Sequence, residues 1–194
     1  LYIACQYGHV DVVRLLLTRK EIQINQALED GSTPLNIACQ EGHVVVVQLL
    51  LAKKEIQTNQ AAKDGSTPLY IACQNGRVDV VRLLLSRKEI QINQCRNNKI
   101  TPINTASNNG HTDIVKLLLA QPNIDINMQD KWGDTPEARA SKKGHTAIVT
   151  LLQQHTGVSM LRKKLKKKMK SAIASDDANK VKTLLDSGMI GVND

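Results

Sequence analysis

The chain has 194 residues, of which 26 are Lys or Arg and 18 are Asp or Glu, so its formal net charge is +8. It contains no Phe and one Trp, and its core must therefore be built from Leu, Val, Ile and Ala. The sequence has no run of about 18 apolar residues and no secretory signal, so it supports neither a membrane span nor secretion.

A short motif recurs along the chain at a fixed interval. Thr-Pro occurs at 33–34, 67–68, 101–102 and 135–136, and Gly occurs at 8, 42, 76, 110 and 144, every interval being 34 residues. Self-similarity at such a period predicts a solenoid of stacked modules, in which neighbours bury one another's apolar faces. This architecture favours surface recognition as the function.

Each repeat predicts a turn followed by two helices. A turn signal such as Asp30-Gly31 precedes a Thr that suits the N-cap and a Pro that suits the first turn of a short helix. That helix ends at the recurring Gly, and a second helix starts almost at once. The second helix carries apolar residues at i, i+3 and i+4, as in Val13, Leu16 and Leu17, which predicts one buried face.

The segment after the second helix changes period. Ile22 and Ile24 alternate with polar residues, and the pattern returns at Ile90 and Ile92 and at Ile124 and Ile126, as expected of an extended arm with one side against a core. The arms close on Asn25, Asn59, Asn93 and Asn127.

The stretch DGSTPLYIACQNGRVDVVRLLL, residues 64–85, resembles the ankyrin repeat, whose T-P-L-H-x-A signature corresponds to residues 67–72. The resemblance covers most of the chain and implies an all-α ankyrin-repeat solenoid of stacked helix-turn-helix units with short hairpin-like turns. Two departures leave the loop path and the side-chain network of the first helices open. The signature His is replaced by Tyr2, Asn36, Tyr70 or Asn104, and the Gly expected after the second helix by Lys20, Lys54, Lys88 or Pro122.

We expect a first array over residues 1–156, with units 1–24 (partial), 25–58, 59–92, 93–126 and 127–156. The fifth unit has Glu137 where others have Leu, followed by Lys142 and Lys143, and resembles a C-terminal cap with a polar outer face. For residues 157–194 we predict a basic amphipathic helix followed by the start of a second array, which resembles an N-terminal capping repeat. This part is joined to the first array through Gly157 and ends at a closing Asn193. Continuous stacking of all units is the alternative. Because the chain opens just after the place of a Thr-Pro and ends where a turn should begin, we expect a monomeric segment of a longer protein.

Three of the four cysteines and the recurring histidines follow the 34-residue repeat, whereas Cys95 stands alone. Cys5, Cys39 and Cys73 share one repeat position beside Ala, which predicts small core residues with free thiols, whereas Cys95 lies on a turn as an exposed bystander or a reactive thiol. The histidines at 9, 43, 111 and 145 are a whole repeat apart, too far to share a zinc ion, so we expect hydrogen bonding at helix starts and no metal. No catalytic motif occurs, and neither an enzyme nor a cofactor is expected.

A cluster of basic residues stands out near the C-terminal end. The basic residues lie on a predicted helix over residues 161–173, and the apolar residues Leu161, Leu165, Met169 and Ile173 recur on one side of that helix. Three interpretations stay open: a helix packing onto Val181 and Leu184, a patch for an acidic partner or nuclear import, and membrane or nucleic-acid binding, which the lack of aromatic anchors disfavours. The basic residues are Arg162, Lys163, Lys164, Lys166, Lys167, Lys168 and Lys170.

Recognition of a protein or peptide partner is expected at the turn tips and the exposed side of the first helices, which the resemblance places on one concave face. Trp132, Tyr7 and Arg96 are the preferred anchors, since aromatic residues and Arg dominate binding hot spots; packing of Trp132 over its own turn is the alternative. We expect a cytoplasmic protein, or a nuclear one if the basic helix directs import, and a passive spacer is the remaining alternative. The predicted partner-binding residues are Tyr7, Gln40, Glu41, Lys63, Gln74, Asn75, Arg96, Asn108, Asn109, Lys131 and Trp132.

Overall fold

The structure is a computed structural model that describes residues 1–186, apart from the side chains of 158–163 and 186; the predicted closing Asn193 lies outside the described residues. The chain divides into two units, Leu1–Val149 and a second one that starts at Thr150. In the described part the regular secondary structure is helical throughout, which confirms the all-α prediction. None of these helices combines the length and hydrophobicity that crossing a bilayer requires.

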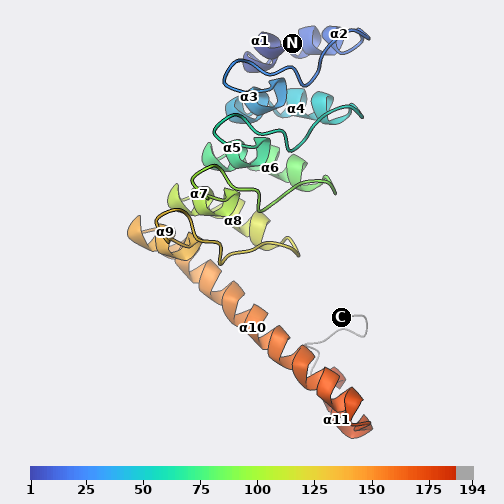
Figure 1. The fold of residues 1–194 in the computed structure, drawn as a ribbon, viewed down its shortest axis with the longest axis vertical. Helices are drawn as coiled ribbons and strands as arrows, with labels where there is room; N and C mark the ends of the chain where they lie inside the picture. Colours follow the sequence, from blue (N-terminus) through green and yellow to red (C-terminus); the bar gives the residue numbers. More distant parts are fainter. Residues whose placement is uncertain (187–194) are drawn as a thin grey trace. The chain divides into compact units, whose positions relative to one another are not determined.

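The first unit is a stack of helix pairs (Figure 1). Figure 1 shows the first helices of the repeats in one row and the second helices in a parallel row, so the predicted solenoid of helix-turn-helix units is confirmed. The first helices are α1 (Tyr2–Gln6), α3 (Pro34–Glu41), α5 (Pro68–Gln74), α7 (Pro102–Asn108) and α9 (Pro136–Lys142). The second helices are α2 (Val10–Leu16), α4 (Val44–Leu51), α6 (Val78–Leu85) and α8 (Thr112–Leu119), and α10 (Thr146–Ala174) begins at the end of this unit.

The recurring Thr-Pro fixes where the first helices begin. The Thr67 hydroxyl accepts a hydrogen bond from the Tyr70 backbone N–H at 3.1 Å, and Pro68 occupies the first turn, where no N–H is needed. Thr33, Thr101 and Thr135 cap their helices in the same way. The predicted helix starts are therefore confirmed.

The core lies between the two helix rows and between successive repeats. Val47, Leu50 and Leu51 are buried as predicted, but Leu16 of the first repeat is only half-buried. The predicted i, i+3, i+4 pattern also missed the position just before its first residue, where Val46 and its equivalents Val80 and Ile114 are at most 1% exposed. The reason is that each second helix packs on its own first helix and also on the neighbouring repeat, so more than one face is buried.

The loops that follow the second helices differ from the predicted arm. They contain turns and no strand in the described chain, for example with the Ile22 N–H donating to the Arg19 carbonyl at 3.4 Å. Ile24 and Ile92 are buried, whereas Ile22 and Ile90 stay half-buried. In the third predicted pair, Ile124 and Ile126, both side chains are half-buried. The predicted alternation therefore buries one Ile in two of the three pairs and is wrong for the third.

Successive loops are tied together by the closing Asn of each repeat. Asn25 donates through Nδ2 to the Glu55 carbonyl at 2.7 Å and accepts at Oδ1 from the Gln57 N–H at 2.9 Å. Asn59 and Asn93 make the same two bonds to the repeats that follow them. The recurring Asn is thus a link between repeats, a role that the sequence pattern alone did not define.

The second unit contains the rest of α10, which runs uninterrupted through Gly157, and α11 (Ala178–Asp186). Their connection reproduces the turn of the first unit: the Asp177 N–H donates to the Ala172 carbonyl at 3.0 Å, as His43 N–H does to Ala38 at 3.1 Å. Asp176 has a φ of 54° at the place of the recurring Gly. That this pair starts a second array stays a prediction.

Candidate protein-binding surface

The first unit presents a continuous surface made of the turn tips and the exposed side of the first helices, which we call the inner face. Its tips are residues 28–31, 62–65, 96–99 and 130–133. Each tip bonds to the next through the backbone: Lys63 N–H donates to the Asp30 carbonyl at 2.9 Å, and Asn97 N–H to the Asp64 carbonyl at 3.0 Å. Lys131 N–H and the Asn98 carbonyl continue the series at 3.0 Å. The tips therefore form a row of fixed spacing.

A polar cleft of about 180 Å³ opens on the inner face beside the third tip. It is bordered by one tip and by residues of three successive first helices, α5, α7 and α9. Its lining residues are Tyr70, Gln74, Arg96, Ile100, Asn104, Thr105, Asn108, Asn109 and Arg139.

Arg96 reaches the cleft from the third tip and is held by the second. Its Nη2 donates to Asp64 Oδ2 at 2.6 Å, in an ion pair whose side chains are 34% and 45% exposed. Burial alone would raise the pKa of Asp64, but the hydrogen bonds from Ser66, and then the hydrogen bond and charge of Arg96, lower it overall. Burial alone would lower the pKa of Arg96, but the hydrogen bond and charge of Asp64, with a smaller contribution from Tyr70, raise it overall. Both groups are therefore charged at neutral pH, in a pair that solvent screens.

Arg139 borders the cleft from α9 and is fixed by a buried carboxylate. Its Nε donates to Asp130 Oδ2 at 2.6 Å, and its Nη2 bonds the same oxygen. Asp130 is fully buried at the side chain, and its Oδ1 accepts the backbone N–H groups of Trp132 at 2.8 Å and Asp134 at 3.0 Å. Burial would raise the pKa of Asp130, but these hydrogen bonds and the Arg139 charge lower it overall.

Amide side chains form the remaining polar lining. Asn108 donates through Nδ2 to Asn109 Oδ1 at 2.9 Å, and Asn109 donates through Nδ2 to the Gln74 carbonyl at 2.9 Å. Asn104 is fully buried, accepts from the Thr101 hydroxyl at 2.7 Å and donates to the Asp134 carbonyl at 3.3 Å. Because an amide both donates and accepts, the exposed members suit the alternating N–H and C=O groups of an extended peptide.

The structure brings Gln74, Arg96, Asn108 and Asn109 of the predicted partner-binding residues together in this cleft. The other predicted residues lie elsewhere on the surface and do not line the cleft: Tyr7, Gln40, Glu41, Lys63, Asn75, Lys131 and Trp132. Of these, Gln40 donates to Glu41 at 2.9 Å and Asn75 donates to the Ile71 carbonyl of its own helix at 2.9 Å.

The preferred aromatic anchors are exposed. Tyr7 is 64% exposed and stacks on His9 with ring centroids 5.9 Å apart. Trp132 is 59% exposed, with Lys131 Nζ 4.4 Å and Arg139 Cζ 4.9 Å from its ring centroid. The indole therefore packs on cations of its own repeat and still presents a face to solvent.

Sequence reasoning missed Tyr70, Ile100, Asn104, Thr105 and Arg139 as cleft residues. Arg139 carried a usable signal, since Ile37 and Ile71 occupy the equivalent place in earlier repeats and a charge there departs from the pattern. Thr105 departs from Ile at the same position, and Tyr70 and Asn104 depart from the signature His, but these departures do not tell which side chains of neighbouring repeats meet.

The recurring histidines link repeats. Nε2 of His43, His111 and His145 lies 3.0 to 3.1 Å from the carbonyl that ends the first helix of the preceding repeat, Gln6, Gln74 or Asn108. Arg77, which can only donate, bonds the Gln40 carbonyl at 2.8 Å from the same position. The expected bonds at helix starts exist, but they reach the preceding repeat and do not cap the helix that follows. Within the described chain no three His, Cys, Asp or Glu side chains are placed to hold a metal ion.

The buried thiols follow the prediction. Cys5, Cys39 and Cys73 are free and fully buried, and Cys95 is free and half-buried. Burial raises the pKa of Cys5 to about 11, and raises the pKa values of Cys39 and Cys73 further.

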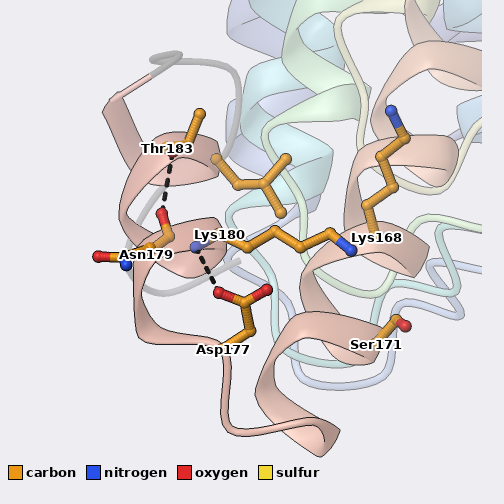
Figure 2. A pocket seen from close by; sticks show the side chains of 7 residues that line it. Lys168, Ser171, Asp177, Asn179, Lys180 and Thr183 are labelled. Carbon is orange, nitrogen blue, oxygen red and sulfur yellow. Dashed lines mark hydrogen bonds between the residues drawn. The ribbon is translucent and has the colours of Figure 1, made fainter.

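The second unit has its own basic surface. Lys164, Lys166, Lys167, Lys168 and Lys170 are exposed, while the side chains of Arg162 and Lys163 lie outside the described ones. Lys168 of α10 and Lys180 of α11 border a pocket of about 710 Å³, whose other lining residues include Ser171, Asp177 and Leu184. Figure 2 shows Lys180 extending from α11 across this pocket toward α10.

Helix pairs stacked in register, an open row of tips and a polar inner face define a helical repeat solenoid with an extended exposed surface. The family described as ankyrin repeats (3 copies) matches residues 1–96, 52–130 and 103–194, and the chain belongs to the ankyrin-repeat family. Ankyrin repeats are in general protein–protein interaction modules on a non-catalytic fold. A comparison with curated proteins gives no match.

Proposed function

We propose that this chain is a non-enzymatic binding module that holds an extended segment of a protein partner on its inner face, with the polar cleft at the centre of the contact. The observation that carries this proposal is the convergence of four predicted recognition residues, from two successive repeats, on one cleft that Arg139 of the next repeat also lines. Free buried thiols suit a reducing compartment, so the proposed location is the cytoplasm or the nucleus.

Preorganisation supports the affinity of such a surface. The tips and first helices are fixed by hydrogen bonds between repeats that do not depend on a partner. A partner would therefore find the amides already in place, and less conformational entropy would be lost on binding. Affinity would come from several modest contacts along the row of repeats.

Peptide selection tests this proposal. A random dodecapeptide library is selected on the purified chain, and enriched peptides are titrated by calorimetry against the wild type and the double variant Gln74→Ala, Asn108→Ala. We expect the affinity to fall about tenfold, or about 1.4 kcal/mol, because two hydrogen-bonding amides are lost. The matched control is Gln48→Ala, which removes an exposed amide on α4, one of the second helices and away from the inner face. Equal affinities for all three proteins would show that peptides bind elsewhere and refute the proposal.

A second candidate function is the docking of an acidic partner on the second unit. Its support is the pocket in which Lys168 and Lys180 flank the apolar Leu184. The test is the binding of an acidic amphipathic peptide at rising salt, since contacts between exposed charges weaken as ions screen them. Lys168→Gln with Lys180→Gln should abolish most of the salt-dependent binding, whereas the exposed Lys166→Gln should lower it less. Equal effects of these variants would contradict a role for the pocket.

A further inference from the structure

We propose that the cleft of the inner face is a socket for one acidic side chain, an internal Asp or Glu of the extended partner segment, with Arg96 as its principal contact. This inference rests on the proposed function and specifies the chemistry of the same site.

The lining of the cleft has one sign of charge. Arg96 lines it from the third tip and Arg139 lines it from α9, and no acidic residue lines it. The other lining groups are amides and hydroxyls, which can donate to an anion, and the single aliphatic wall is Ile100. A carboxylate is the protein group that such a lining complements best, since guanidinium–carboxylate hydrogen bonds are about twice as strong as neutral ones.

The internal ion pairs leave donors available. Arg96 uses Nη2 for Asp64 and also interacts with the Tyr70 side chain, and Arg139 uses Nε and Nη2 for Asp130. A guanidinium has five N–H donors. Both arginines therefore keep donors for a further acceptor while their own carboxylates hold them in position.

The two arginines differ in how much of their charge is already compensated. Arg139 faces a fully buried Asp130, and Asp134 Oδ2 lies 3.8 Å from its Nε, so its charge is neutralised in a low-dielectric setting. Arg96 faces Asp64 in a pair that is a third to a half exposed, where solvent weakens the attraction. Arg96 consequently retains more attraction for an incoming anion.

The size of the cleft and its place favour an internal side chain. A volume of about 180 Å³ corresponds to about six water molecules, which suits one acidic side chain and not a folded element. Exposed polar residues continue the inner face on both sides, with Gln40 on α3 and Lys142 on α9. A partner segment that crosses the cleft can therefore continue along the inner face in both directions. This favours an internal acidic side chain of the partner over the carboxylate at its C terminus.

The test uses peptides selected from a dodecapeptide library that is fused to its carrier through the C terminus, so that no free terminal carboxylate is offered. We expect enrichment of one acidic position. An enriched peptide and its Glu→Gln or Asp→Asn analogue are then titrated against the wild type, Arg96→Gln and the control Arg82→Gln, an exposed arginine on α6 outside the cleft. Calorimetry gives the affinities. The fluorescence of Trp132, the only Trp of the chain, reports occupancy beside Arg139.

For the wild type and the control, neutralising the peptide acid should lower affinity about tenfold, and for Arg96→Gln less than about twofold. The peptide exchange on the wild type needs no folded variant, so it decides the question even if Arg96→Gln is unstable. Peptides that bind through Gln74 and Asn108 without an acidic preference would overturn this inference and leave the proposed function standing. Peptides unaffected by those amides would overturn the proposed function itself.

Discussion

Replacing Asp130 by Asn removes the charge that fixes the last tip of the first unit. The Asn side chain can still accept the Trp132 and Asp134 N–H groups at one oxygen. At the other position its NH₂ group would meet the Arg139 donors, because an amide nitrogen cannot accept a hydrogen bond. The variant therefore leaves a guanidinium that is only 19% exposed without its main counter-charge.

The structure sets the size of the expected effect. Breaking a buried ion pair by removing one partner typically costs about 3 to 5 kcal/mol. Because Asp134 lies 3.8 Å from Arg139 and can take over part of the pairing, we expect about 2 to 3 kcal/mol for Asp130→Asn. The matched control is Asp64→Asn, which breaks the exposed pair with Arg96 and should cost at most about 1 kcal/mol.

Urea unfolding followed by two probes measures this difference. In a repeat stack each module depends mainly on its neighbours, so the last repeat can unfold before the others. Trp132 fluorescence reports the tip that holds Asp130, and circular dichroism reports all helices. For Asp130→Asn the fluorescence midpoint should fall clearly below that of the wild type, with a smaller change in circular dichroism. Equal midpoint shifts for Asp130→Asn and Asp64→Asn would refute the argument.

The effect of this substitution should also depend on pH in a fixed direction. The pKa of Asp130 is lowered in the folded state, so its contribution to stability is fully present above the ordinary Asp pKa of about 3.9 and is lost as pH falls through the lowered value. The stability difference between wild type and Asp130→Asn should therefore be constant near neutral pH and shrink below about pH 4. A difference that grows on acidification would show that the charge is not the cause.

Two further predictions concern the links between repeats and the thiols. Gly110→Ala should destabilise the stack more than Gly144→Ala in urea melts: both have positive φ, 78° and 75°, worth about 1 to 2 kcal/mol of strain, but a Cβ at Gly110 would lie 2.7 Å from His145 Cε1 and one at Gly144 meets nothing within 4 Å. Equal losses would contradict packing of the imidazole on the glycine. With a thiol reagent at pH 8, Cys95 should react first and the buried cysteines only on unfolding, and Cys95→Ser should abolish the fast phase; rapid reaction of several thiols would contradict their burial.

The fold could be predicted from the sequence because its determinants are local and repeated. Thr67 and Pro68 define a helix start by their own chemistry, and the 34-residue spacing copies that start along the chain. The bonds between repeats could not be predicted in the same way. The pairing of His43 with the Gln6 carbonyl joins residues 37 apart, and a periodic pattern does not tell which atoms of neighbouring units meet.

The residues of the cleft could likewise be predicted only in part, but one kind of sequence signal would have identified more of them. Arg96 and Asn108 were predicted because they vary on an exposed side of the repeat, but their neighbour Arg139 was not. Asp130 and Arg139 both replace residues that are uncharged or of opposite sign at the equivalent places of earlier repeats. Two departures of opposite charge within one repeat predict an ion pair, so searching for paired departures would have found this side of the cleft.

The tips are linked by backbone hydrogen bonds that do not depend on which side chains they carry. Side chains at the tips can therefore be chosen for a partner without a loss of stability. At the tips, Asn97 differs in charge and size from Lys63 and Lys131, yet each of the three donates its backbone N–H to the preceding tip at 2.9 to 3.0 Å. Their side chains can therefore change with little effect on the links that hold the tips in a row. The proposed recognition then depends on side chains that differ between repeats, and the two arginines that border the cleft are among these.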